Sequence, residues 1–184
     1  MAAARASALV FRLSSRWYGP NPANAGLTWL GQERIAIGAV PTIESVADLS
    51  LQGVTHVVNC RAWTQAFMSQ DLGVERLTFG RDRVVHAPMH DLGLPQHPRR
   101  WAVAARFAAD ALDSDPEARV LIHCQQGRRR SAMIAYSVLR LRGHTAEAAT
   151  SLILRHRTQA ELVPAYVRSV EKWLGSDHAV VHRQ

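Results

Sequence analysis

The residues that could do chemistry gather in one stretch of the chain, where a cysteine and an arginine stand six positions apart. Residues 120–131 read VLIHCQQGRRRS, so an apolar run ends at Cys124, a short loop with one glycine follows, and an apolar helical stretch starts at Ser131. In a tight strand-to-helix loop, successive backbone N–H groups point inward, and the positive end of the helix dipole adds to this anion-binding nest. The pattern predicts a site for a phosphate dianion.

The same loop predicts a reactive cysteine. The nest, the helix dipole and the nearby Arg130 should lower the pKa of Cys124 from about 8.5 into the range of about 3.5–7.5 found for reactive cysteines. Arg130 can return over the nest and hold two oxygens of a phosphoryl group with its planar guanidinium. These groups favour in-line attack of a thiolate on phosphorus. The alternative, an inert buried cysteine before a basic helix start, is disfavoured by the strand–loop–helix context.

The sequence His123-Cys124-x5-Arg130-Ser131 resembles the signature loop of the protein tyrosine phosphatase superfamily, and the length and layout are similar to the small dual-specificity phosphatases. The resemblance implies that Cys124 is the nucleophile that forms a phosphocysteine intermediate and that Arg130 binds the phosphate and the transition state. It implies that Ser131 donates its hydroxyl to the thiolate, that His123 holds the loop through hydrogen bonds, and that neither a metal nor a cofactor is needed. It also implies five further residues that bind phosphate through backbone N–H groups: Gln125, Gln126, Gly127, Arg128 and Arg129.

Such a reaction needs a carboxylic acid on a loop above the nest, which protonates the leaving oxygen and later activates water. Asp91 follows an apolar stretch, lies in the Gly- and Pro-bearing sequence DLGLP at 91–95, and precedes Cys124 by 33 positions, which matches the place of the acid in the resembling family. Asp82, with an arginine on each side, is the alternative and is more typical of a charge-paired turn residue. We therefore expect Asp91 to be the general acid.

Four other stretches of the sequence resemble the subgroup that includes the mitochondrial-type lipid phosphatases: residues 16–18, 35–41, 53–59 and 155–157. Members of that subgroup act on phosphatidylglycerophosphate or phosphoinositides, so a phospholipid is an alternative to a phosphorylated protein as the substrate. The loop interior departs from that subgroup, which usually carries Lys-Ala where this chain has Gln125-Gln126. A non-catalytic phosphate-binding module is a third reading, which the presence of Cys124, Arg130 and Asp91 disfavours.

Short apolar stretches bounded by breaker residues predict strands at 34–37, 55–59, 75–79, 84–87 and 120–123. Helical periodicity predicts helices at 43–52, 98–113, 131–142, 146–157 and 160–174. Together with the resemblance, this order predicts an α/β fold with a single mixed, mostly parallel sheet flanked by helices, and with the C-terminal helices packed on one face. We expect an N-terminal amphipathic or flexible segment at 1–20, a phosphatase domain at 21–174 and a tail at 175–184.

The length suits one domain of ordinary size, and the charge suits an anionic partner. The chain has 184 residues and a formal net charge of +7, and Lys172 is its single lysine, so nearly all its bases are arginines. Arginine suits phosphate and carboxylate groups, although codon usage in a GC-rich genome would enrich it equally. No apolar run approaches the roughly 18 residues that span a bilayer. We expect a monomer that binds no nucleic acid.

Two features bear on the compartment. In a helix over residues 5–17, the arginines fall on one side and Leu9, Val10 and Leu13 on a neighbouring arc, which fits a mitochondrial presequence, an interfacial membrane helix or a helix packed on the domain. Only two cysteines are present, which favours a reducing compartment. The single lysine and the abundant Arg and Ala suggest a GC-rich bacterium and hence the cytoplasm, whereas in a eukaryotic source the first 16 residues would suit a mitochondrial presequence. Cys60 is either a small buried hydrophobe or, as the resemblance allows, a disulfide partner for an oxidised Cys124.

Overall fold

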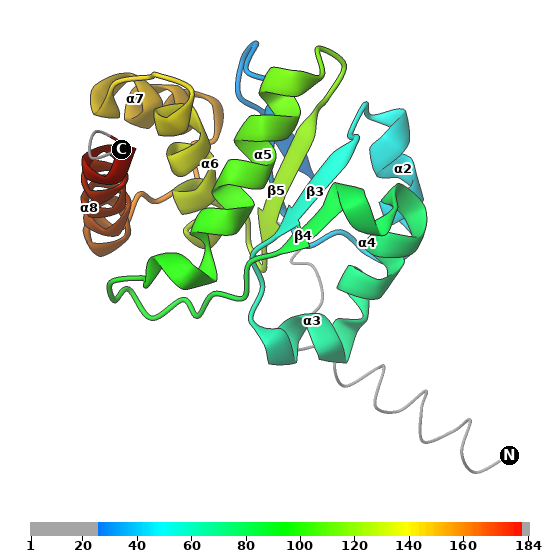
Figure 1. Ribbon diagram of the computed structural model, residues 1–184. Helices are drawn as coiled ribbons and strands as arrows, with labels where there is room; N and C mark the ends of the chain where they lie inside the picture. Colours follow the sequence, from blue (N-terminus) through cyan, green and yellow to red (C-terminus); the bar gives the residue numbers. More distant parts are fainter. Residues whose placement is uncertain (1–25, 182–184) are drawn as a thin grey trace, which may run out of the picture.

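The computed structural model describes residues 26–181, and its centre is a five-stranded sheet in the order β1-β2-β5-β3-β4 (Figure 1). The strands are β1 (Leu27–Trp29), β2 (Ile35–Ala39), β3 (His56–Asn59), β4 (Val84–His86) and β5 (Val120–Cys124). Only the edge strand β1 is antiparallel to its neighbour, so the sheet is mixed and mostly parallel. This confirms the predicted fold class.

Helices cover both faces of the sheet. The α-helices are α2 (Val46–Leu51), α3 (Trp63–Ser69), α4 (Asp71–Phe79), α5 (Ala102–Ser114), α6 (Arg130–Leu141), α7 (Ala146–His156) and α8 (Pro164–Val181), with 3₁₀ turns η2 (Arg81–Arg83) and η3 (Pro98–Arg100). Helices α5 to α8 lie together on one face, as predicted for the C-terminal helices, whereas α2 and α4 lie on the other (Figure 1). No helix in the described range 26–181 is both long and apolar enough to cross a membrane.

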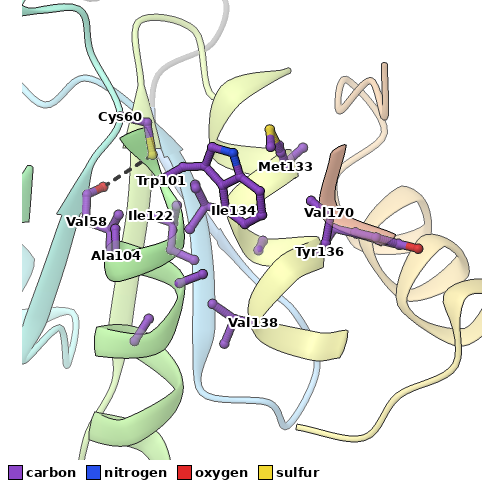
Figure 2. Packing of buried hydrophobic residues seen from close by; sticks show 14 of the residues in the cluster. Val58, Cys60, Trp101, Ala104, Ile122, Met133, Ile134, Tyr136, Val138 and Val170 are labelled. Carbon is purple, nitrogen blue, oxygen red and sulfur yellow. Dashed lines mark hydrogen bonds between the residues drawn. The ribbon is translucent and has the colours of Figure 1, made fainter. Parts of the chain in front are cut away.

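Side chains that alternate along the strands divide the interior into two layers, because successive strand residues point to opposite faces. Val58 and Ile122 belong to the larger cluster, which they form with α5, α6 and α8 around the fully buried Trp101 (Figure 2). Their neighbours Val57 and Leu121 pack instead against α2 and α4. The central strands are buried on both sides, which explains why they read as short continuous apolar runs.

The sequence-based assignment fails in four places. Residues 75–79, expected as a strand, belong to α4, because Leu72 and Glu75 stand three apart and share its buried face. The three-residue β1 and the helix α3 were not expected from the pattern. Residues 175–181, expected as part of a tail, continue α8. The predicted segment 1–20 lies outside the described residues.

The parallel arrangement determines where the site lies. Ala39 of β2 is paired with Cys124 of β5, and Asn59 of β3 with His123. The carboxyl ends of these strands therefore meet at one edge of the sheet, which is its lower edge in Figure 1, above α3. In open α/β sheets this edge is where ligands usually bind.

Candidate active site

The loop between β5 and α6 has a backbone shape that only glycine suits. Gly127 has a φ of +62°, and a Cβ there would lie 2.5 Å from the backbone carbonyl of Gly38 on β2 and 2.5 Å from the Arg157 guanidinium. The carbonyl oxygen of Gly127 accepts a hydrogen bond of 2.8 Å from Nε of the buried Arg157. The loop therefore rests on a neighbouring strand and on the residue that follows α7.

Cys124 lies at the bottom of this loop and is 2% exposed. Its Sγ is 3.4 Å from Oγ of Ser131. Burial alone would raise the pKa of the thiol, but the charge of Arg130, the hydroxyl of Ser131 and the backbone N–H groups of Ser131 and Arg128 outweigh it and lower the pKa to about 7. The thiol is therefore about half ionised at neutral pH, whereas an unperturbed cysteine is almost wholly protonated.

Arg130 begins α6 and is 4% exposed, beside the cysteine. Its Nη1 donates to Oε1 of Gln65 on α3 at 2.9 Å and to the carbonyl of Met89 at 3.1 Å. Its Nε is buried without a hydrogen-bond partner. Arg130, Gln65 and Asp91 all line one open pocket of about 330 Å³. The guanidinium is thus held on one side and keeps a donor for an anion entering that pocket.

Asp91 lies on the loop between β4 and η3, where the structure brings it to the same pocket as Arg130. Its Oδ1 accepts a hydrogen bond of 3.0 Å from the hydroxyl of Tyr166 on α8 and lies 4.0 Å from Nη1 of Arg129. Asp82, the alternative acid, lies in η2 just before β4. It is therefore at the amino-terminal ends of the parallel strands, away from Cys124. Of these two aspartates, Asp91 is the one that lines the Arg130 pocket.

The remaining loop residues are held by side chains from elsewhere in the chain. Oε1 of Gln125 accepts two hydrogen bonds from Arg61, at 3.1 Å from Nε and 2.7 Å from Nη2. Gln126 is exposed. Arg128 and Arg129 both approach Glu161, and the Arg129 contact is 2.8 Å from Nε to Oε2. The two arginines stand at the rim of the site, and the Glu161 carboxylate partly neutralises them.

His123 does not turn its side chain toward the loop. The imidazole points to the α4 face of the sheet, where its Nε2 lies 2.7 Å from Oε1 of Glu75, and both side chains are fully buried. The His123 backbone carbonyl accepts a hydrogen bond of 2.8 Å from the backbone N–H of Cys60. Burial opposes a charge on the ring, but the carboxylates of Glu75 and Asp71 outweigh it and raise the pKa of His123 above its ordinary value.

The ligand-type groups Asp71, Glu75 and His123 lie within 4.8 Å of one another, and we considered them as a cation site. Asp71 already accepts from Asn59 at 2.7 Å and from Arg61 at 2.6 Å. The contact of 2.7 Å between Glu75 and His123 is too short for both to be ligands of one ion lying between them. These groups pair with one another in a network, although Nδ1 of His123 is buried without a hydrogen-bond partner and its Nε2 contacts Glu75 as an ion pair only.

Cys60 is fully buried in the apolar cluster near Trp101 (Figure 2). Burial raises the pKa of its thiol well above the ordinary value, and the neighbouring Cys124 adds to this effect. Both cysteines are free. The packing is that of a small buried hydrophobe, and a disulfide with Cys124 stays a prediction.

The pattern-based reasoning missed several side chains of the site, among them Arg61, Gln65, Glu75 and Tyr166. The first three come from α3, α4 and the connection before them, which the sequence reading had assigned to a loop and a strand. One signal was present, because Asp71 and Glu75 are four residues apart and would share one face of a helix.

No protein-family model matches the sequence, and no curated protein matches it. Solved structures do. PTPMT1 is 17% identical, with a TM-score of 0.69 over 86% of this chain and 100% of that chain. Human DUSP28 is 20% identical, with a TM-score of 0.65 over 86% and 98% of the two chains. PTPMT1 in complex with PI(5)P is 16% identical, with a TM-score of 0.68 over 81% and 95%. The predicted cysteine-based phosphatase fold is thereby confirmed.

Proposed function

We propose that this chain is a cysteine-dependent phosphomonoester hydrolase of the dual-specificity type, which works through a phosphocysteine intermediate. The observation that carries the proposal is the juxtaposition of Cys124 with Arg130 and Asp91. The thiol has a pKa of about 7, the guanidinium keeps a buried donor without a partner, and the carboxylate lines the same pocket. Arg130, the anion holder, therefore interacts with the nucleophile Cys124 and shares a pocket with the proton donor Asp91.

The reaction follows from these positions. The Cys124 thiolate attacks phosphorus, the bond from phosphorus to the ester oxygen breaks, and Asp91 gives its proton to the departing oxygen. Water then attacks the phosphocysteine while Asp91 takes a proton from it, and the sulfur–phosphorus bond breaks to release inorganic phosphate. The hydroxyl of Ser131, 3.4 Å from the sulfur, stabilises the thiolate as it leaves.

Hydrolysis of an aryl phosphate and its inhibition by vanadate test this proposal. Cys124→Ser should abolish turnover, because a serine hydroxyl is not ionised at neutral pH. Asp91→Ala should slow alkyl phosphates far more than an activated aryl phosphate, whose leaving group needs no proton. Unchanged turnover in Cys124→Ser would refute the proposal.

A phospholipid is the second candidate substrate, and the exposed side chains around the site favour it. Leu92 and Leu94 on the Asp91 loop, and Trp63 and Phe67 on α3, are large, apolar and exposed. None of the four lines the Arg130 pocket itself, since Trp63 and Phe67 line a neighbouring pocket, but their two segments supply other residues that do. Exposed apolar side chains on the two segments that line a pocket with a buried arginine suit a headgroup presented at a membrane surface. The similar PTPMT1 was solved in complex with PI(5)P.

Comparing hydrolysis of a phosphoinositide in vesicles with hydrolysis of phosphopeptides distinguishes the two candidate substrates. Phe67→Asp and Leu92→Asp should lower hydrolysis on vesicles several-fold and leave a soluble aryl phosphate unaffected. The matched control is Leu51→Asp, because Leu51 is 85% exposed but lies at the end of α2 near the opposite edge of the sheet. Equal effects of all three variants would refute a membrane role for Phe67 and Leu92.

A further inference from the structure

Five polar side chains form a buried network on the α4 face of the sheet, beneath the phosphate loop. Asn59, Arg61, Asp71, Glu75 and His123 are each at most 2% exposed. Charged residues are almost never buried to this degree unless they are paired. Because α4 carries two of these residues, the network joins this helix to the strands that end at the site.

The contacts run in one chain from the loop to the helix. Gln125 of the loop is held by Arg61, and Arg61 donates to Asp71 at 2.6 Å. Nδ2 of Asn59 then joins the two carboxylates, at 2.7 Å from Asp71 and 3.1 Å from Glu75. This series of contacts ends at His123, which is covalently next to the nucleophile. It therefore reaches the loop from both sides of Cys124.

With both carboxylates ionised, the charges of this network balance when His123 is protonated. Asp71 and Glu75 bring two negative charges into a space without solvent, and Arg61 compensates one of them. Asn59 is neutral, so the second carboxylate would be an uncompensated buried charge, which is strongly destabilising. His123 is the remaining group in contact with Glu75, and its imidazolium form restores neutrality.

We propose that Glu75 is a positioning residue that pairs with a protonated His123, and that this ion pair completes a neutral support which fixes the phosphate loop. The proposal rests on the proposed function only for its catalytic consequence, because the state of His123 can be measured without any turnover. Glu75 touches neither substrate nor nucleophile, so it acts through His123.

The groups that face His123 set the direction of its pH dependence. Asp71 and Glu75 on α4 favour the imidazolium, whereas Arg61 and burial oppose it, and the pKa is raised as a result. His86 on β4 bonds the carbonyl of Arg61, and its own pKa is lowered, chiefly by burial. The support is therefore complete below the ordinary histidine pKa of about 6.5 and is lost as the pH rises through the raised value of His123.

Nitrogen-15 NMR of the histidine side chains tests the first half of the proposal. In the wild-type chain at about pH 7.5, where an unperturbed histidine is about nine-tenths neutral, both ring nitrogens of His123 should give imidazolium shifts. In Glu75→Gln they should give neutral shifts, and Glu75→Asp should restore the imidazolium at least in part. A neutral His123 in the wild-type chain would overturn the proposal.

Binding of inorganic phosphate tests the second half, in a Cys124→Ser background that removes the thiolate charge. Glu75→Gln should weaken phosphate binding about tenfold, with partial recovery in Glu75→Asp. The matched control is Glu33→Gln, because Glu33 also contacts a histidine, His144 at 3.3 Å, but in a partly exposed pair away from the loop. It should leave phosphate binding unchanged.

Unchanged phosphate binding in Glu75→Gln would overturn the positioning role. If Glu75→Gln does not fold, the Cys124→Ser chain decides the matter alone, because its phosphate affinity should then fall in step with the loss of the His123 proton. If phosphate affinity and the protonation of His123 changed independently with pH, the proposal would be overturned. Loss of turnover in every assay would instead contradict the proposed function and leave these measurements valid.

Discussion

Replacing Gly127 by alanine should damage the site more than its size suggests. The residue has a φ of +62°, and left-handed backbone costs a residue with a Cβ about 1–2 kcal/mol. The new Cβ would also lie 2.5 Å from the backbone of Gly38, and β2 cannot retreat because Gly38 is paired with His123 on β5. Overpacking of this kind adds about 1–3 kcal/mol. We expect a total destabilisation of about 2–5 kcal/mol.

The assay is thermal or urea unfolding of Gly127→Ala beside Gly143→Ala. Gly143 has a φ of +90°, but a Cβ there would meet nothing within 4 Å, so this control measures backbone strain alone. For a domain of this size each kcal/mol lowers the Tm by roughly 2–4 °C. Gly143→Ala should therefore lower the Tm by only a few degrees, and Gly127→Ala by about 4–20 °C.

Activity provides the second readout of this experiment. Displacing the loop moves the Gly127 carbonyl from Nε of Arg157 and moves the N–H groups that face the phosphate. The kcat/KM of Gly127→Ala should fall at least about a hundredfold, which corresponds to about 2.7 kcal/mol, whereas Gly143→Ala should keep its activity. Equal melting temperatures and equal activities in the two variants would refute the argument from close approach.

Three further outcomes follow from the contacts of the site. Alkylation of Cys124 by iodoacetamide should rise with pH around its pKa of about 7, and Ser131→Ala should shift this midpoint upward by about one unit; an unmoved midpoint would contradict the role of the hydroxyl. Tyr166→Phe removes the hydrogen bond of 3.0 Å that orients the Asp91 carboxylate, so it should lower kcat several-fold for alkyl phosphates only. Steady-state kinetics with an alkyl and an aryl phosphate check this. Arg157→Met should lower kcat/KM about tenfold or more and raise the alkylation midpoint, since it removes a buried cation that interacts with Cys124; a wild-type pH profile would contradict this.

The reactive loop was predictable because its chemistry is local. Cys124, Arg130 and Ser131 lie within eight residues, and the strand, the glycine and the helix start around them are visible in the sequence itself. Asp91 could be predicted from its loop composition and its distance from the cysteine along the chain. In the structure, Cys124 lies 3.4 Å from Ser131 and interacts with the charge of Arg130, and Arg130 lines the same pocket as Asp91.

The support of the loop was not predictable in the same way. Arg61 reaches Gln125 across 64 positions, and Glu75 reaches His123 across a comparable span, so no local pattern reports either contact. The stretch that contains Glu75 alternates like a strand over its last few residues. Its helical character depends on packing against β3 and β4, which the propensity of so short a segment does not reveal.

The order of the site's parts along the chain has a consequence for how the protein matures. Cys124 is synthesised well before Arg157, which holds the loop, and before Tyr166, which holds Asp91. A nascent chain emerges from its N-terminus, so the sheet strands are all present before these last supports exist. A chain cut short before α8 would lack Tyr166, so the Asp91 carboxylate would lose its hydrogen bond of 3.0 Å while the groups around Cys124 were already in place.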